Sequence, residues 1–531
     1  MKIRRIDPER CFGDNRLYVD YLAGRGAARH LYSHAPHDFR GALGARRKHQ
    51  YPRVSLVEGL RGYNERLGAH GPALRNIDRL ADGRTFCIIT GQQAGFLGGP
   101  VYTLYKIVTA LRLAELCSGT LGIDAVPVFW LATDDHDVHE VDHAYLLEED
   151  GEVGTVRFPA VHDGRPVEAL SCSPDISAAY ERYFEHLAAG TRAGPPPADS
   201  VQAARDTVPP PAGGRYGEWI ARIWSNLFSD VGLVIVEPHI LRATAGDCFR
   251  RIAGLDGEIS RRVAAAGRAI QSAGYDPVPL SPRAGTLFRF DDGGRRTRLE
   301  RPGEHAETAA EHPERYSPDV LLRPLMVDSI LPVLAHVLGP GEFAYHAYLK
   351  PLYELFGYAQ PLLYPRKSYT VLGSSETERI ERYGRAVEEI LCGAAAATGA
   401  PDITIPGSGG RLFDEAREGF ARALAPLRPY VEAIDPGLVE THRRASSQAQ
   451  RALDTLRERA VRAVMSGRGM SKGEYRRLVN LIVPKGRMQE RVFPLPFFLA
   501  LAGRRFLDAV MNAGELDDFS HTLITLETID E

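Results

Sequence analysis

Two short apolar segments, each followed by a loop dense in glycine or in acidic residues, restrict the possible folds of this chain more than its other parts do. Thr85–Thr90 ends at Gly91, and Ala125–Thr133 ends at an acidic loop. Between them, apolar residues recur at helical spacing from Val101 to Ala114. A strand, a helix and a second strand form the βαβ unit, in which the two strands are parallel. The pattern therefore predicts an α/β fold built on a buried parallel sheet.

The glycine loop Gly91–Pro100 lies at the carboxyl end of the first strand, which is where open parallel sheets bind ligands. Pro100 suits the first turn of the following helix, and a helix N-terminus offers N–H groups to a phosphate or carboxylate. The loop matches neither the GxGxxG pattern nor the Walker pattern. It predicts an anion site, or in the alternative only a tight turn. Lys106 in the helix either approaches that anion or is exposed.

The acidic loop Asp134–His143 is the densest group of ionisable residues in the chain. His136, His139 and His143 have a spacing that is compatible with a zinc site on a helix. Alternatively, His136 and its neighbouring carboxylates bind substrate or transfer protons. A third interpretation is a capped, acidic first turn of a helix. We favour substrate binding or acid–base chemistry, and the residues alone leave all three open.

The core continues after long interruptions. Val231–Glu237 and Pro361–Tyr364 are predicted to be further buried strands. The apolar run Leu321–Val337 contains Arg323 and Asp328, and buried charges need partners or a ligand.

Two further segments carry polar groups next to this core. The turn Gly339–Glu342 precedes a helix that contains Tyr345, His346 and Lys350. The loop Pro365–Ser368 follows the last strand, and it either clamps a polyphosphate or is an exposed loop.

The polar stretches between these segments are interpreted as insertions. Ala193–Gly214 is rich in proline and is predicted to be a mobile loop, and Asp291–Gly294 is a hairpin signal. We assign residues 1–150, 216–273 and 317–373 to the core, 151–215 and 274–316 to two connecting insertions, and 374–531 to a C-terminal helical domain.

Apolar residues in the C-terminal domain recur at spacings of three and four, as in a coiled coil. This pattern predicts a helical hairpin or a dimerisation stalk. Gly469–Gly473 resembles the KMSKS signature of class I aminoacyl-tRNA synthetases, but its place among the predicted helices indicates a chance match. Pro484–Arg491 either reaches back to the core and a ligand or is a loop between helices.

Composition excludes several classes of protein. The net charge of −3 argues against binding nucleic acid through bulk positive charge. The six cysteines are scattered, with no CxxC pair, as expected in a reducing cytosol. The N-terminus lacks an apolar signal core, and no apolar run approaches the roughly 18 residues of a membrane helix. We expect a soluble, cytoplasmic protein.

Six segments, in this order along the chain, resemble those of one known family: TGQQAGFLGGPVYTLYK, VPVFWLATDDHDVHEVDH, SPDVLLRPLMVDSILP, GPGEFAYHAYLKPLYELFG, PRKSYTVL and PKGRMQER. The family is that of the bacillithiol biosynthesis cysteine-adding enzymes (BshC family), which are cysteine ligases, and the resemblance spans nearly the whole chain. It implies a Rossmann-like core similar to class I synthetases and nucleotidyltransferases, two connecting insertions, and a C-terminal coiled coil that pairs two subunits into a homodimer.

The resemblance also implies a reaction, the last step of bacillithiol synthesis. In that step the carboxyl group of cysteine is joined to the amino group of glucosaminyl-malate. Because a carboxylate must be activated before it forms an amide, we expect ATP as the cofactor. A cysteinyl-adenylate is the expected intermediate, with an acyl phosphate as the alternative. Small molecules are the expected partners, with neither nucleic acid nor membrane.

The resemblance indicates the regions of the site, and for the residues in them we expect the following roles. The catalytic set is Asp135, His136, Asp137 and Lys106. The nucleotide-binding set is Gly91, Gln92, Gln93, Gly98, Gly99, Tyr102, Arg366, Lys367 and Ser368. The substrate-binding set is Arg323, Gly341, Glu342 and Tyr345.

One departure from the family bears on the metal interpretation. Members often carry a carboxylate where His139 stands, which weakens a three-histidine zinc site, and no metal is assigned. Three rival interpretations remain: an ATP-dependent ligase or nucleotidyltransferase with another acceptor, a coiled-coil scaffold without activity, and a zinc hydrolase.

Overall fold

A computed structural model of the chain describes residues 1–160, 163–190, 196–278, 286–393, 409–467 and 471–527. By their internal contacts these residues divide into two compact units. The first comprises Met1–Glu148, Val153–Val371 and Met488–Glu527, and the second contains Glu149–Glu152 and Leu372–Arg487. The predicted domain 374–531 therefore differs from the structure, in which Met488–Glu527 are part of the same compact unit as the core.

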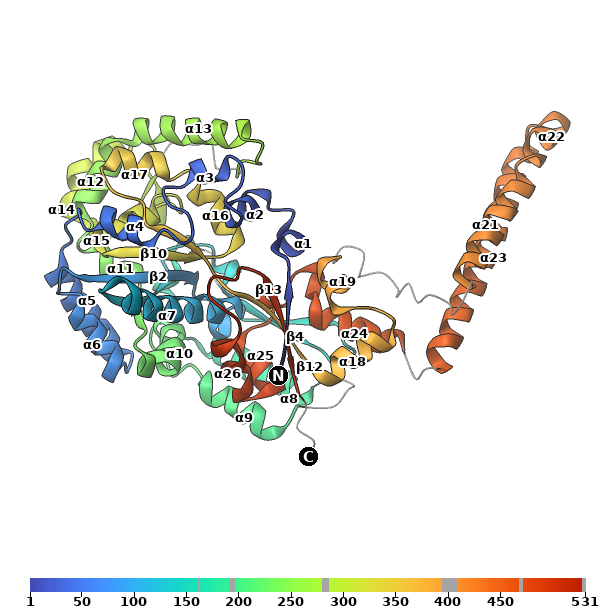
Figure 1. Ribbon diagram of the computed structural model, residues 1–531, viewed down its shortest axis with the longest axis horizontal. Coiled ribbons are helices and arrows are strands. Elements are labelled where there is room, and N and C mark those ends of the chain that lie inside the picture. Colours follow the sequence, from blue (N-terminus) through green and yellow to red (C-terminus); the bar gives the residue numbers. More distant parts are fainter. Residues whose placement is uncertain (161–162, 191–195, 279–285, 394–408, 468–470, 528–531) are drawn as a thin grey trace. The chain divides into compact units, whose positions relative to one another are not determined.

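A five-stranded parallel sheet forms the centre of the first unit, in the order β11-β10-β2-β3-β6 (Figure 1). The strands are β2 (Thr85–Gln93), β3 (Asp124–Ala132), β6 (Val234–Val236), β10 (Val333–Leu338) and β11 (Leu362–Pro365). The helix α7 (Tyr102–Leu121) connects β2 to β3 and packs on both. The predicted α/β fold is confirmed.

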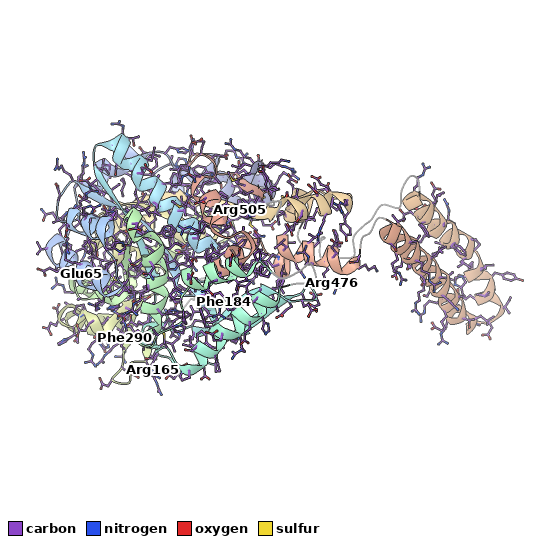
Figure 2. The ribbon with its side chains drawn as sticks, turned by 90° about the horizontal axis from the view of Figure 1, so that it is seen from below. Glu65, Arg165, Phe184, Phe290, Arg476 and Arg505 are labelled. Carbon is purple, nitrogen blue, oxygen red and sulfur yellow. The ribbon has the colours of Figure 1, made fainter. Side chains whose placement is uncertain are left out.

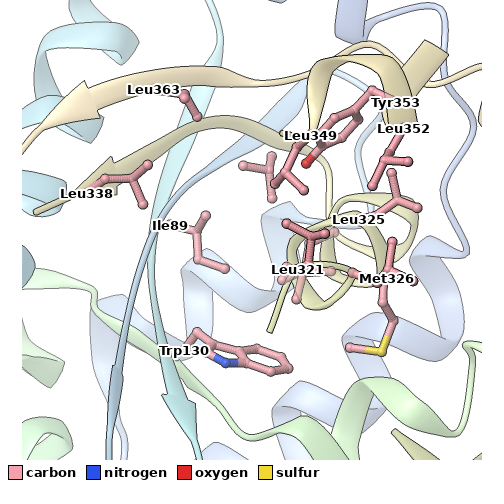
Figure 3. Close-up of a cluster of buried hydrophobic side chains, with 14 of the residues drawn as sticks. Ile89, Trp130, Leu321, Leu325, Met326, Leu338, Leu349, Leu352, Tyr353 and Leu363 are labelled. Atoms are coloured by element: carbon pink, nitrogen blue, oxygen red, sulfur yellow. The ribbon is translucent and has the colours of Figure 1, made fainter. Parts of the chain in front are cut away.

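Side chains of the central strands alternate between the two faces of the sheet, as the pleat requires. Cys87 and Ile89 belong to one buried cluster, whereas Phe86 and Ile88 belong to another that includes side chains of α7. In the larger cluster, Ile89 lies with side chains of the segment that contains α15 (Arg323–Ile330) (Figure 3). Because both faces are covered, these strands are apolar throughout, which is why the sequence revealed them.

The apolar run Leu321–Val337 divides into two elements, α15 and β10. Two short helices follow, α16 (Pro340–His346) and α17 (Lys350–Phe356). Near the N-terminus, α5 (Arg53–Arg66) packs against β6. Charged side chains of such surface helices, for example Glu65, point outward in Figure 2.

The segments predicted as insertions contain helices and short antiparallel sheets. The first has the hairpin β4 (His143–Leu147) and β5 (Val153–Arg157), then α8 (Pro174–Ala189) and α9 (Ala198–Thr207). Helix α9 corrects the predicted mobile loop Ala193–Gly214, of which residues 193–195 lie outside the described part. Val201 and Ala204 of α9 are buried, and α9 packs on α25 (Leu495–Ala502), so tertiary contacts override its local composition.

Residues 216–273, which were predicted to belong to the core, contain α10 (Tyr216–Phe228), α11 (Pro238–Arg242), α12 (Gly246–Gly254) and α13 (Asp256–Ser272). The hairpin predicted at Asp291–Gly294 is confirmed: it joins β7 (Leu287–Phe290) to β8 (Arg296–Arg298). A third strand, β9 (Tyr316–Pro318), pairs with β7.

The last strand of the chain, β13, pairs with the first strand, β1. The sheet β1-β13-β12 joins Lys2–Ile6, His521–Leu526 and Ser368–Gly373, and Lys2 is paired with Thr525. The sequence did not predict this strand, because its pairing partners lie far away along the chain. Helix α26 (Arg504–Asn512) precedes it.

The second unit contains α18 (Ser374–Arg382), α19 (Val387–Cys392) and α24 (Lys472–Ile482). Its other helices are α21 (Gly409–Leu424), α22 (Leu427–Ile434) and α23 (Leu438–Gly467), and α21 packs along α23 as the predicted helical hairpin. Ser471, from the KMSKS-like peptide, caps α24 by accepting a hydrogen bond from the Glu474 amide. In the described ranges, no helix is both long and apolar enough to cross a bilayer.

Candidate functional site

A cavity of about 370 Å³ lies at the carboxyl edge of the parallel sheet. Its walls come from the ends of β2, β3 and β10, from α7, α15 and α16, and from the residue that follows β11. The carboxyl ends of parallel strands meet at one edge, so these distant segments converge there. The lining includes many of the predicted site residues: Gly91, Gln92, Gln93, Tyr102, Lys106, Arg323, Gly341, Glu342, Tyr345 and Arg366.

Lys106 joins two sides of this cavity. Its Nζ donates to the Gly91 carbonyl at 2.8 Å and to Gln92 Oε1 at 3.2 Å, and it forms an ion pair with Glu342 Oε2 at 2.6 Å. Only 3% of the Lys106 side chain is exposed. Burial lowers the pKa of this amine, and the charge of Glu342 opposes that effect. The exposed alternative for Lys106 is therefore wrong.

Three cations surround the ring of Tyr102. The Nζ of Lys106 lies 5.7 Å from the ring centroid, and the guanidinium carbons of Arg366 and Arg491 lie at 5.3 and 5.7 Å. Arg491 belongs to the segment Pro484–Arg491, so the end of that segment does reach the cavity. The region has a concentrated positive charge that suits a phosphate or carboxylate.

Two protein groups fix the position of the Arg366 guanidinium. It forms an ion pair with Glu490 at 2.5 Å and donates to the Lys367 carbonyl at 2.9 Å. Its Nε is buried and has no hydrogen-bond partner among the described residues. Buried donors are almost always paired, so an unpaired one beside a cavity indicates a place for an acceptor atom of a ligand.

Gly98 and Gly99 do not line the cavity, contrary to the prediction. A Cβ on Gly98 would lie 3.0 Å from the Trp224 ring, and a Cβ on Gly95 would lie 2.6 Å from the Gly99 Cα. Gly98 and Gly99 also have positive φ angles, of 90° and 74°. The amide of Val101, at the start of α7, donates to the Phe493 carbonyl at 2.8 Å. These glycines therefore serve close packing.

Lys367 and Ser368 also point away from the cavity. Lys367 Nζ donates to the Glu515 carbonyl at 2.9 Å, and burial lowers the pKa of this amine to about 8. Ser368 Oγ donates to Glu490 Oε2 at 2.9 Å and contacts His521 Nδ1 at 2.8 Å. Of the predicted basic loop, Arg366 alone is among the cavity residues.

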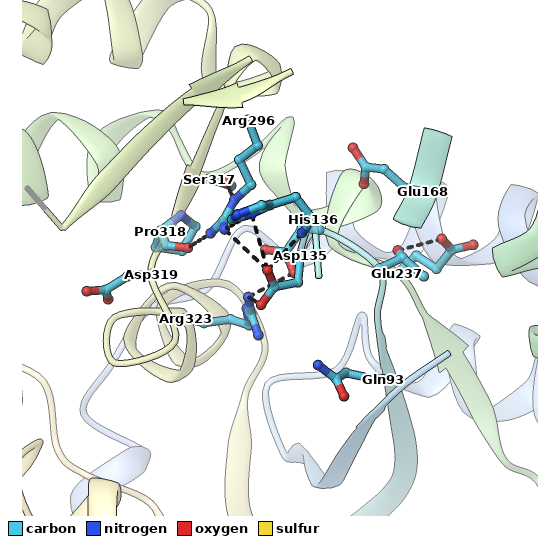
Figure 4. A network of polar contacts seen from close by, with 12 residues as sticks. Gln93, Asp135, His136, Glu168, Glu237, Arg296, Ser317, Pro318, Asp319 and Arg323 are labelled. Atoms are coloured by element: carbon cyan, nitrogen blue, oxygen red, sulfur yellow. Dashed lines mark hydrogen bonds and ion pairs between the residues drawn. The ribbon is translucent and has the colours of Figure 1, made fainter. Parts of the chain in front are cut away.

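The acidic loop lies beside the cavity and is joined to it by Arg323 (Figure 4). Arg323 Nη2 is 3.1 Å from Asp134 Oδ1 and 4.0 Å from Asp135 Oδ2. A second cation, Arg296, is 3.6 Å from Asp135 Oδ1. Burial raises the pKa of Asp135, but the charges of Arg296 and Arg323 outweigh it, so that pKa lies below its usual value.

Asp135, His136 and Asp137 are not among the cavity-lining residues. The main-chain amide of His136 donates to Asp135 Oδ1 at 2.8 Å. Asp135 therefore acts on the cavity through Arg323, whose position it helps to determine. Gln93 and His136 lie at the same edge of the sheet, as Figure 4 shows.

The three histidines of the zinc interpretation do not converge. His143 Nδ1 is 2.9 Å and His139 Nδ1 is 3.6 Å from Asp142, which also pairs with Arg157. His136 instead lies near Arg296. Within the described part of the chain, no group of three or more His, Cys, Asp or Glu side chains is arranged to hold a metal ion.

Several site residues were not predicted. Arg296 comes from the hairpin of the second insertion, where it is buried and donates to Ser317 Oγ at 2.8 Å. Glu490 lies inside Pro484–Arg491, a segment in which the sequence singles out no individual residue. His336 lines the cavity from β10, and a histidine within an otherwise apolar strand was the signal that could have revealed it.

A further buried carboxylate, Glu237, lies at the end of β6. It accepts hydrogen bonds from Thr133 Oγ1 at 2.8 Å and from the Tyr63 hydroxyl, and burial raises its pKa. Because these donors belong to the protein, Glu237 is part of the structural frame of the sheet edge and is not among the cavity residues.

Comparison with known proteins gives a consistent match over both parts of the chain. Residues 1–367 match the family model described as "Bacillithiol biosynthesis BshC, N-terminal Rossmann-like domain". Residues 410–526 match the model described as "Bacillithiol biosynthesis BshC, C-terminal coiled-coil domain".

Individual relatives are similar over nearly their whole length. A protein of Koribacter versatilis, named "Putative cysteine ligase BshC", is 31% identical over 521 residues, which cover 94% of this chain and 95% of the relative. Proteins of the same name from Salinibacter ruber and Geobacillus thermodenitrificans are each 30% identical, and cover 96% and 94% of this chain and 96% of each relative.

Proposed function

The chain belongs to the BshC family of bacillithiol biosynthesis, and from this premise we propose that it is a ligase that uses ATP to join the carboxyl group of L-cysteine to the amino group of glucosaminyl-malate. The names of its relatives support the cysteine ligase activity. The resemblance described above supplies the acceptor and the nucleotide.

One structural observation supports this proposal more than the others: a cavity at the carboxyl edge of the sheet contains Lys106, Arg366 and Arg491 around one aromatic ring. When ATP activates a carboxylate for amide formation, the leaving group bears phosphate, and its negative charge increases as the bond to it breaks. Fixed cations in a partly buried site stabilise such charge most effectively. The unpaired Nε of Arg366 fits an oxygen of that group.

We assign the remaining cavity residues by their chemistry. Gln92 and Gln93 offer amide groups at the end of β2, and the hydroxyl of Tyr102 accepts a hydrogen bond from Gln92 Nε2 at 2.9 Å. Glu342 is 25% exposed and suits the ammonium group of cysteine. Arg323 suits a substrate carboxylate.

The test is product analysis with purified protein. Cysteine, glucosaminyl-malate and ATP should together give a product whose mass equals the two substrates minus water, with AMP or ADP formed in equal amount. Omission of each substrate in turn, and replacement of cysteine by serine, provide the controls. Cysteine-dependent nucleotide cleavage that gives no amide product when glucosaminyl-malate is present would indicate another acceptor. The absence of both amide product and nucleotide cleavage would contradict the proposal.

A further inference from the structure

A buried aspartate–histidine pair lies at the wall of the cavity. His336 Nε2 donates to Asp328 Oδ1 at 2.9 Å and to Oδ2 at 3.0 Å. The aspartate comes from α15 and the histidine from β10, and the Asp328 side chain is fully buried. Nothing in the activity described so far uses this pair.

The aspartate is held in place by a second donor. The hydroxyl of Tyr353, from α17, donates to Asp328 Oδ2. Arg46 connects the two elements by donating to the main-chain carbonyl of Asp328 at 2.7 Å and to that of Val333 at 2.8 Å. The carboxylate therefore has a defined position, and it can orient the imidazole ring.

His336 is one of the cavity-lining residues, and 9% of its side chain is exposed. Its Nδ1 has no hydrogen bond to any residue that the structure describes, while Nε2 carries the proton donated to Asp328. Nδ1 then has a free lone pair. Because His336 lines the cavity, this nitrogen is available to accept a proton from a group bound there.

We propose that His336 is the general base of amide formation, with Asp328 as its positioning residue. The inference rests on the proposed ligase function. The amine nitrogen of the acceptor attacks the activated cysteine carbonyl, and a C–N bond forms. The C–O bond to the phosphate-bearing group breaks, and its electron pair leaves with that oxygen. The proton lost by the amine moves to His336 Nδ1, and Asp328 stabilises the resulting imidazolium.

The arrangement of charges supports this assignment. The cations of the cavity, Lys106 and Arg366, are held by Glu342 and Glu490 and are suited to the leaving group. His346, which also lines the cavity, has its ring centroid 5.6 Å from that of His336. Burial lowers the pKa of His346 well below its usual value, so this neighbour stays neutral and adds no charge that would oppose protonation of His336.

The experiment separates activation of cysteine from capture by the amine. Hydroxylamine is largely unprotonated at neutral pH and captures an activated carboxyl group without help from a base. His336→Gln should therefore form cysteine hydroxamate at a rate close to that of the wild type, while its kcat for ligation to glucosaminyl-malate falls about 100-fold or more. The KM values for ATP and cysteine should change little.

Asp328→Asn provides a second test, because asparagine has nearly the same shape as the aspartate it replaces. The asparagine amide would donate to His336 Nε2 and so place the imidazole proton on Nδ1, which removes the lone pair. Ligation should again fall about 100-fold in kcat, with unchanged KM values and intact hydroxamate formation. His70→Gln is the matched control, because His70 forms an exposed pair with Asp230 at 2.9 Å, and its activity should equal that of the wild type.

The outcomes distinguish the two proposals. If the wild type forms neither hydroxamate nor amide, the proposed function itself fails. If the wild type is active and His336→Gln ligates within threefold of it, the base assignment is overturned. Equal loss of hydroxamate and amide in folded His336→Gln or Asp328→Asn, checked by thermal unfolding, would also overturn it, since a base for the amine is not required for capture by hydroxylamine.

Discussion

At the scale of single residues, the cavity depends on charged side chains that are buried beside an opposite charge. Arg366 and Glu490 are exposed by only 2% and 1% of their side chains, and Lys106 pairs with Glu342 in the same region. Removing two ions from water costs several kcal/mol each, so such pairs add little net stability, but loss of one partner is severe. The pairs hold cations where a ligand can use them.

Replacing Glu490 by Gln should destabilise the fold, because it removes one partner of a buried ion pair. Glu490 also accepts hydrogen bonds from Ser368 Oγ and from the Tyr369 amide, so its loss leaves a buried guanidinium without a counter-charge. We expect the free energy of unfolding to fall by about 3–5 kcal/mol, as measured by urea denaturation. Asp78→Asn, which removes the exposed partner of Arg61, is the control and should cause no measurable loss. An equally small loss in both variants would contradict this account.

Asp135→Ala tests the acidic loop. Without this carboxylate, Arg323 loses one partner and Arg296 loses its ion pair, so the cation that faces the cavity is no longer well positioned. We expect kcat/KM for ligation to fall about 100-fold, because small errors in position are costly in catalysis. Steady-state kinetics measure this, with Asp82→Ala, an exposed partner of Arg84, as the control. Full ligation activity in Asp135→Ala would refute the role of Asp135.

At the scale of elements, strand β13 connects the last residues to the first unit. His521 in this strand is fully buried between the hydroxyls of Ser368 at 2.8 Å and Thr370 at 3.0 Å. Burial lowers the pKa of His521 from its ordinary value of 6.5 to about 4, although Glu490 opposes this. The strand is therefore stable with a neutral imidazole.

This shift predicts a dependence of stability on pH. Between pH 6.5 and about 4, the unfolded chain binds a proton at His521 that the folded chain does not. The free energy of unfolding should therefore decrease as the pH falls through this window, by up to about 3 kcal/mol from this residue. In His521→Gln, urea denaturation across the same range should show a shallower decrease. Parallel curves for the two proteins would contradict the prediction.

At the scale of the whole molecule, helices α21–α23 leave apolar side chains exposed in a single chain. Tyr430 is 67%, Ile434 63% and Leu456 56% exposed. Exposed apolar groups of this kind commonly pack against another chain. The helical hairpin is confirmed, whereas pairing of two subunits stays a prediction.

We expect the wild-type protein to sediment as a homodimer and the double variant Tyr430→Glu, Ile434→Glu to sediment as a monomer. Both positions lie on α22, so in a symmetric interface the charges introduced on this helix of each subunit would be buried without partners, which is costly. Analytical ultracentrifugation measures the mass, and circular dichroism verifies that helix content is unchanged. A monomeric wild type, or a variant that stays dimeric, would show that α21–α23 do not pair the subunits.

Local patterns were enough to identify the parallel strands, the helix α7, the hairpin after Phe290 and the helical C-terminal part, because strand and helix periods repeat within a few residues. They also indicated which loops lie at the carboxyl edge of the sheet. Contacts across hundreds of residues had no such local signature. The fold alone decided that Gly98 and Gly99 serve packing, that α9 is ordered by α25, and that β13 pairs with β1.

The same division applies to the site. Lys106, Arg366 and Arg323 were predicted from the type and place of the residue, but burial and pairing with Glu342 and Glu490 came only from the tertiary structure. Asp328 stands out in the sequence as a charge in an apolar run, whereas its hydrogen bond with His336 depends on where the structure places α15 and β10. A chain specifies where polar groups follow strands, whereas the direction of each side chain depends on which distant elements fill the space around it.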